Sequence, residues 1–77
     1  MNKARRKQLA EVATVIEKTK EVLEGILEDE QDYYDNIPEN LYGSEKAEAS
    51  GEAIDAMEEV IGELDLALET INDIVDE

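Results

Sequence analysis

Apolar residues recur with alternating steps of three and four along two long segments of this 77-residue chain. In the first segment the series is Leu9, Val12, Ile16, Thr19, Leu23, Ile26, Glu30 and Tyr33. In the second segment it is Ala47, Ser50, Ile54, Met57, Ile61, Leu64, Leu68, Ile71 and Val75. Two seam positions in every seven residues are typical of packed α-helices. An alternating strand pattern would place Glu and Lys in the core, so we expect an all-α protein.

A short polar segment separates the two periodic stretches. Pro38 cannot continue a helix and disfavours the helical conformation of the residue before it. Gly43 tolerates a positive φ, and Ser44 is well suited to cap the helix that follows. The sequence therefore predicts a single domain with a helix over 3–34, a turn over 35–43 that contains one short helical turn, and a helix over 44–75.

The charges indicate that the two helices run in opposite directions. Residues 1–27 carry six basic and four acidic side chains, whereas residues 28–77 carry one basic and eighteen acidic side chains. An antiparallel hairpin brings the basic N-terminal segment beside the acidic C-terminal one. It also places Tyr33 and Tyr34 opposite the small residues of 47–53, where large rings leave no void.

A second apolar column flanks the seam of the second helix. It consists of Ala53, Val60, Ala67 and Ile74. With Val15 and Val22 on the first helix, the apolar stripe is about three positions wide per heptad, which is typical of a bundle interior. We therefore expect the hairpin to associate with copies of itself, either as a twofold-symmetric four-helix bundle or as a higher helical oligomer.

The composition excludes several classes of function. The chain has no Cys and no His, so it has no disulfide, no zinc-thiolate site, no imidazole base and no His-ligated metal. No apolar run is long enough to span a bilayer, and none follows the basic N-terminus as a signal peptide requires. We expect a cytoplasmic protein without cofactor, metal or membrane partner. An enzyme is not expected, because one small hairpin has no cleft that excludes water.

Acidic side chains dominate the second helix. Residues 52–77 hold ten carboxylates and no basic group. Such a rod can imitate the phosphates of a nucleic acid and attract a basic groove on a protein, although a solvated surface that keeps the chain soluble is the alternative. The side chains expected to bind a basic partner are Glu58, Glu59, Glu63 and Asp65. Direct binding of nucleic acid to this face is not expected.

The basic cluster and the aromatic residues suggest a second kind of site. Between subunits of an oligomer, the cations could hold phosphates and the aromatic rings could stack on a base. The candidates for this ligand site are Arg5, Arg6, Lys7, Tyr33, Tyr34 and Tyr42. Alternatively, the cations pair with the acidic C-terminal segment, and one ring, Tyr33 in the first instance, packs the end of the hairpin.

Two positions of the first seam are polar. Thr19 and Glu30 stand where apolar side chains are expected, and a charge in a seam costs stability unless it has a partner. Near the turn, Glu30 is expected to reach solvent or to pair with Lys46. The neighbouring acidic run lacks the central Gly and terminal Glu of a calcium loop.

The turn sequence resembles that of known proteins. The residues Tyr34-Asp35-Asn36-Ile37-Pro38-Glu39, followed by Ser44-Glu45 and preceded by a basic start, are similar to those of small acidic helical proteins encoded by phages and prophages of Firmicutes. Phage proteins similar in size and charge often inhibit host defence, by occupying a nuclease or by sequestering a nucleotide signal. The resemblance thus implies an origin in an infected or lysogenic bacterium.

These observations together favour a non-enzymatic binding protein. The leading hypothesis is a phage-encoded inhibitor of host defence whose acidic helical face binds a basic, nucleic-acid-binding host protein. One alternative is an oligomeric sponge that sequesters a nucleotide second messenger. Another is a structural or assembly protein.

Overall fold

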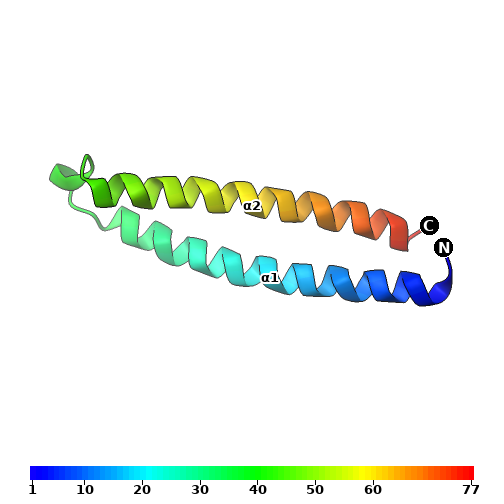
Figure 1. The fold of residues 1–77 in the computed structure, drawn as a ribbon. Coiled ribbons are helices and arrows are strands. Elements are labelled where there is room, and N and C mark those ends of the chain that lie inside the picture. The colour runs from blue at the N-terminus through cyan, green and yellow to red at the C-terminus, as the bar shows by residue number, and fades with distance from the viewer.

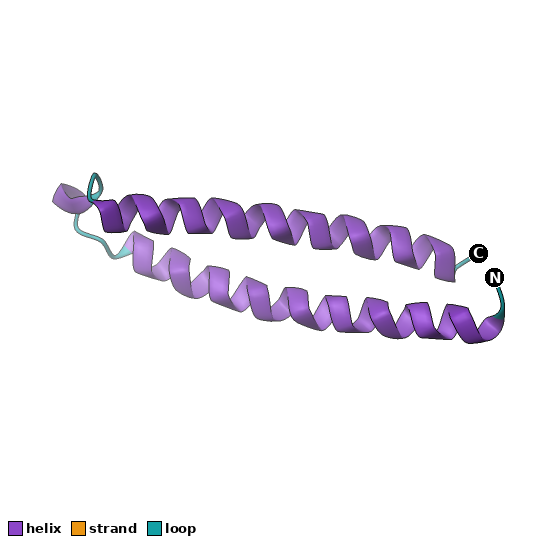
Figure 2. Ribbon diagram, viewed as in Figure 1, coloured by secondary structure: helices purple, strands orange, loops and turns teal.

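The computed structural model describes residues 1–77 as two long helices folded back on each other (Figure 1). Helix α1 spans Lys3–Asp35 and helix α2 spans Glu45–Val75, and a 3₁₀ turn, η1, spans Glu39–Leu41. No strand is present (Figure 2). The all-helical fold and the mutual packing of the two helices are therefore as expected, with bounds that differ by one residue from those derived from the periodicity.

Side chains cap the N-termini of both helices. The Ser44 hydroxyl accepts a hydrogen bond from the backbone N–H of Ala47 at 3.2 Å, as its position before α2 predicted. Asn2 caps α1, its side-chain oxygen accepting from the N–H of Arg5 at 2.8 Å. Each cap satisfies one of the backbone donors that a helix start leaves free.

The connection holds the predicted short helical turn, in which the N–H of Leu41 donates to the carbonyl of Pro38 at 2.8 Å. The positive φ that the sequence suggested at Gly43 does not occur, because no residue of the chain has a positive φ. The chain reverses direction instead through right-handed and extended conformations at Asn36, Pro38 and Tyr42.

The hairpin is long and thin, with extents of 59 × 15 × 14 Å. Its accessible surface is 5822 Å², whereas a compact monomer of 8.6 kDa exposes about 4,700 Å². Only four residues are buried, namely Ala13, Ala47, Ser50 and Ile54. One chain thus leaves about 1,100 Å² more surface in contact with solvent than a compact fold of its size.

The seam of α2 is the one the sequence predicted. All nine positions of the series from Ala47 to Val75 are buried or half-buried, and Ala47 is 1% exposed. Small residues stand near the turn, where α1 contributes a tyrosine. A Cβ placed on Gly51 would lie 3.6 Å from Cε2 of Tyr34, so the ring packs directly against the α2 backbone.

Half of the predicted α1 seam is wrong. The positions Leu9, Ile16, Leu23 and Glu30 do face α2, but Val12, Ile26 and Tyr33 are 46, 53 and 50% exposed, and Thr19 is exposed as well. The second column of the seam lies one residue further along: Arg6, Ala13, Lys20, Leu27 and Tyr34, all buried or half-buried. Helix α1 is therefore turned so that its small and mixed column, and not its more apolar one, meets α2.

The two termini lie together at the end of the hairpin opposite the turn (Figure 1). Here Nη1 of Arg6 donates a hydrogen bond to the backbone oxygen of Glu77 at 2.6 Å. The expected approach of the basic N-terminal segment to the acidic C-terminal one is therefore present, although it joins one cation only. Neither helix contains an apolar stretch long enough to cross a membrane.

Candidate functional site

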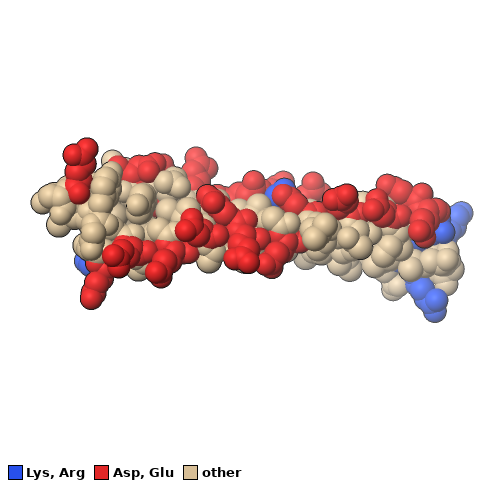
Figure 3. All heavy atoms as spheres, turned by 90° about the horizontal axis from the view of Figure 1, so that it is seen from above, with Lys and Arg blue, Asp and Glu red and all other residues tan.

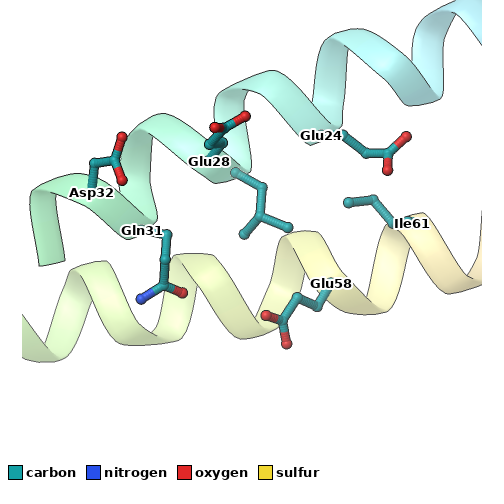
Figure 4. A pocket seen from close by; sticks show the side chains of 7 residues that line it. Glu24, Glu28, Gln31, Asp32, Glu58 and Ile61 are labelled. Atoms are coloured by element: carbon teal, nitrogen blue, oxygen red, sulfur yellow. The ribbon is translucent and has the colours of Figure 1, made fainter. Parts of the chain in front are cut away.

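One side of the hairpin carries a shallow groove edged by carboxylates from both helices. Its two apolar lining residues are Leu27 and Ile61, and its volume is about 480 Å³. Figure 4 shows Glu24, Glu28 and Asp32 on one helix and Glu58 on the other. The residues that line it, called the acidic groove below, are Glu24, Leu27, Glu28, Gln31, Asp32, Glu58 and Ile61. Four of the seven are carboxylates, and no basic side chain lines the groove.

The α1 residues of this groove follow from helix geometry. Glu24, Glu28 and Asp32 recur every four residues, which places them along one face of α1 about one turn apart. Like charges at this spacing repel one another and destabilise the helix, so a nearby cation would reduce this repulsion. These three residues were not among the side chains expected to bind a partner, although their four-residue spacing is visible in the sequence.

The four side chains that were expected to bind a partner project to different sides of α2. Glu58 and Asp65 are seven residues apart and lie along one line on the side of the acidic groove. Glu59 and Glu63 are exposed but project about 100° and 140° away from Glu58 around the helix. The four therefore do not form one surface, and only Glu58 lines the acidic groove.

Asp65 already forms an ion pair within the chain. Its Oδ1 lies 2.5 Å from the ammonium of Lys20, and this is the only ion pair between side chains in the molecule. The hydrogen bond from Lys20 to Asp65 raises the lysine pKa above its ordinary value, and the negative charges of Glu24 and Glu17 act in the same direction. Lys20 thus neutralises one end of the acidic side and also attracts Glu24 at the edge of the groove, whereas Glu28, Asp32 and Glu58 form no ion pair.

The basic cluster lies at the end of the molecule with the termini (Figure 3). Of its members, only Arg6 has a hydrogen-bonded partner at the C-terminal end of the chain, the backbone oxygen of Glu77, which follows α2. Lys3, Arg5 and Lys7 are exposed and form no ion pair with the C-terminal carboxylates. Three cations are therefore available to groups outside the chain.

The tyrosines lie at the other end, around the turn. The rings of Tyr34 and Tyr42 stack with centroids 5.9 Å apart and planes 10° from parallel. Contrary to the packing alternative, it is Tyr34 and not Tyr33 that packs the end of the hairpin, and Tyr33 is half exposed. The cations and rings proposed for a nucleotide thus lie at opposite ends of a 59 Å molecule, and one chain cannot bring them to one ligand.

Glu30, the charged residue in the α1 seam, has a hydrogen-bonding partner that the sequence did not suggest. Glu30 accepts a hydrogen bond from the Ser50 hydroxyl at 2.8 Å across the helix pair, and not an ion pair from Lys46. The other polar seam candidate, Thr19, lies outside the seam and donates to the carbonyl of Val15 in its own helix at 2.8 Å. No group of acidic side chains converges closely enough to hold a metal ion.

The side of the hairpin opposite the acidic groove carries apolar residues with charged ones at their edge. Tyr33 and Ala53 line a shallow depression there together with Glu30 and Lys46, and Ile26 and Tyr33 line the next one along α1 together with Asp29 and Glu30. Steps of seven residues extend this surface along both helices. The resulting apolar face consists of Val12, Ile26, Tyr33, Ala53, Val60, Ala67 and Ile74. The predicted second column of α2 is thus one half of this face. In a single hairpin Ala53 and Val60 are exposed, whereas Ala67 and Ile74 are half-buried.

Comparison of the chain with protein families, with curated proteins and with solved structures found no match. The site is therefore interpreted from its own geometry and charge.

Proposed function

We propose that this protein is a non-enzymatic binding protein whose acidic groove docks on a basic surface of another protein. The observation that carries the proposal is the acidic groove itself, which Glu24, Glu28, Asp32 and Glu58 line from two helices and which no basic side chain lines. The net charge of −15 adds a long-range attraction toward a basic partner.

The chemistry of the partner follows from the arrangement of the charges. Carboxylates spaced along a rigid rod present negative charge in a row, as the phosphates of a nucleic acid do. A surface with rows of Lys and Arg that normally holds nucleic acid is therefore the best complement. In this proposal the protein excludes the nucleic acid from that surface and so inhibits its partner. The resemblance of the turn to phage-encoded proteins favours a host-defence protein, such as a nuclease, in that role.

We also propose that the working form is an assembly of hairpins. A single chain has four buried residues and an uncovered apolar face, which is little for a stable fold. The nucleotide-sponge alternative has no support from a single chain, because its cations and rings lie at opposite ends and only an assembly could bring them to one ligand. No observation favours a structural or assembly role.

The test compares two triple variants that each remove three negative charges. Glu24→Gln, Glu28→Gln and Glu58→Gln remove three of the four carboxylates of the acidic groove and leave Asp32, whereas the control Glu11→Gln, Glu52→Gln and Glu59→Gln changes exposed carboxylates on the outer sides of the helices. Each protein is immobilised and exposed to the heparin-binding fraction of bacterial proteins, with and without competing DNA duplex.

The wild type and the control are expected to retain the same nucleic-acid-binding protein and to release it to the duplex. The groove variant is expected to retain at least tenfold less. Equal retention by both variants would show that net charge, and not the acidic groove, accounts for binding, and the proposal would be wrong.

A further inference from the structure

The apolar face is a surface of the hairpin that its own chain leaves largely exposed to solvent. Val12, Ile26, Tyr33 and Val60 are each at least two-fifths exposed along a rod whose interior buries only four residues. We infer that a second copy of this chain covers the apolar face head to tail, so that the termini of one hairpin lie against the turn of the other. The inference deepens the proposed self-association and does not depend on the acidic groove.

The size of the face fits such an interface. One long side of the hairpin measures 59 by 15 Å, so a second hairpin laid along it covers on the order of 800 Å² per partner, the usual size of a specific interface. The single chain exposes about 1,100 Å² more than a compact fold of its mass. One further hairpin on this face therefore accounts for most of the excess surface.

Another copy of the chain is the occupant that matches in shape. Both molecules are straight rods of equal length with apolar residues repeating every seven positions, and the product is a four-helix bundle. A twofold axis makes each contact occur twice. With the hairpins head to tail, α1 lies on α1 and α2 lies on α2, each pair antiparallel.

The distribution of charge along the hairpin favours one of the two directions in which the second hairpin can lie on the first. Around the turn, residues 28–50 carry eight acidic side chains and one basic one, a net charge of −7. At the other end, residues 1–13 and 64–77 carry six acidic and four basic ones, a net charge of −2. Hairpins that point the same way would bring the two −7 ends together, which is the most repulsive pairing available.

The head-to-tail arrangement also uses the free cations. It places Lys3, Arg5 and Lys7, which have no ion pair in their own chain, beside the acidic last two turns of α1 of the partner. Arg5 lies in the same seven-residue column as Val12 and Tyr33, so it approaches Tyr33 of the partner subunit, and a guanidinium is attracted to an aromatic ring.

The side chains complement one another in this direction. Val12 comes opposite Ile26 of the partner subunit, and Ala53, which is small, comes opposite Ile74 of the partner subunit, which is large. Thr19 stands at the middle of α1, between Val12 and Ile26 in the same column, and so lies near the twofold axis and faces Thr19 of the partner subunit. This last juxtaposition occurs only when the hairpins point in opposite directions.

The first test measures mass in solution by light scattering after size exclusion, at low salt and at 0.5 M NaCl. The wild type is expected to have twice the 8.6 kDa of one chain and to associate more tightly in high salt, which screens the repulsion between two chains of charge −15. The variant Ile26→Ser with Val60→Ser should lose at least tenfold in dimer affinity, whereas Leu66→Ser, at an exposed position away from the face, should lose none.

The second test uses the absence of cysteine from the natural chain. Under mild oxidation Thr19→Cys is expected to form a covalent dimer, and Lys18→Cys, on the outer side of α1, is expected not to. A mixture of Thr19→Cys and Ala67→Cys separates the two directions, because hairpins that point the same way would place α1 on α2 and join these two positions to each other.

A helical protein with the mass of one chain at both salt concentrations would overturn the inference, and a disulfide that joins Thr19→Cys only to Ala67→Cys would overturn the direction. Ile26, Val60 and Thr19 lie outside the acidic groove. Failure of the acidic groove to bind a basic partner would therefore leave these results unchanged, and the two proposals can fail separately.

Discussion

The hydroxyl of Ser50 donates a 2.8 Å hydrogen bond to Oε2 of Glu30 across the two helices. Ser50 is 5% exposed and Glu30 is half-buried, so this polar link lies inside a seam that is otherwise lined mostly by aliphatic and small side chains. The molecule has one other polar interaction between side chains of α1 and α2, the ion pair of Lys20 with Asp65. A partly buried carboxylate that loses its donor keeps part of its desolvation cost without the compensating hydrogen bond.

Replacing Ser50 with Ala should therefore reduce the free energy of unfolding by about 1–2 kcal/mol, because the Glu30 carboxylate loses its donor in the seam. Replacing both residues, with Glu30→Leu and Ser50→Ala, should restore or exceed wild-type stability, since no polar group is then left unpaired. Urea unfolding followed by circular dichroism at 222 nm measures both. The control Thr70→Ala removes an exposed hydroxyl that bonds only to its own helix, at Leu66, and should cost little. Equal losses for the Ser50 and Thr70 variants would contradict the prediction.

The ion pair between Lys20 and Asp65 predicts a dependence of stability on alkaline pH. Folding raises the pKa of Lys20 above its ordinary value of 10.5, chiefly through the hydrogen bond to Asp65. A raised pKa means that the stabilisation is complete below 10.5 and is lost as the pH rises through the higher value in the folded state. The Tm advantage of the wild type over Lys20→Met should thus be constant from pH 7 to 10 and should shrink above 10.5.

Arginine at the same position provides the control for this titration. Its guanidinium stays protonated across the range, so Lys20→Arg should keep its own advantage over Lys20→Met where the wild type loses it. All three proteins contain the same tyrosines, so the ionisation of those residues cancels in the comparison. An advantage of the wild type that stays constant to pH 12 would show that the pair does not contribute to stability.

The sequence predicted α2 better than α1 for a physical reason. In α2 one pair of columns is apolar or small at every position, from Ala47 to Val75, so the seam is unambiguous. In α1 the column of Leu9, Ile16 and Leu23 can pair with either neighbouring column, and the more apolar of these two neighbours contains Val12 and Ile26. Hydrophobicity alone selects that column, but α1 presents the column of Ala13 and Lys20 to α2. Packing against small partners and the pair with Asp65 favour that rotation, and neither depends on residues near in sequence.

The candidate site also depended on the rotation of α1, which the sequence pattern did not determine. The abundance of carboxylates on α2 was evident, but a groove requires two helices at a known rotation. Glu58 joins Glu24 and Glu28 only because α1 turns this face toward it, whereas the neighbouring Glu59 faces away. Charge counts therefore indicated the kind of partner, and the rotation of α1 determined which carboxylates lie together.

The few buried apolar residues predict an uneven response to truncation. Ile54 is 6% exposed, and Ile54→Ala should reduce the free energy of unfolding by about 2–4 kcal/mol through lost burial and the cavity left behind. Leu66 is 64% exposed on the outer side of α2, so Leu66→Ala should change stability by less than about 0.5 kcal/mol. Thermal unfolding of the two variants at equal protein concentration makes the comparison. Similar losses would mean that Leu66 is covered in solution.

Glycines inside the helices predict where stability can be gained. A Cβ added to Gly25 or Gly62 would meet no atom within 4 Å, and both residues lie in the interior of long helices. Alanine restricts the unfolded chain and propagates a helix better than glycine, so each replacement should raise the free energy of unfolding by about 0.5–1 kcal/mol.

Gly51 supplies the contrast, because its Cβ would lie 3.6 Å from the Tyr34 ring. There Ala should be accepted at ordinary contact distance, whereas Gly51→Leu should displace the ring and cost about 1–3 kcal/mol. Urea midpoints for the four variants test the series, and a gain for Gly51→Leu equal to that for Gly62→Ala would show that Tyr34 does not pack against α2.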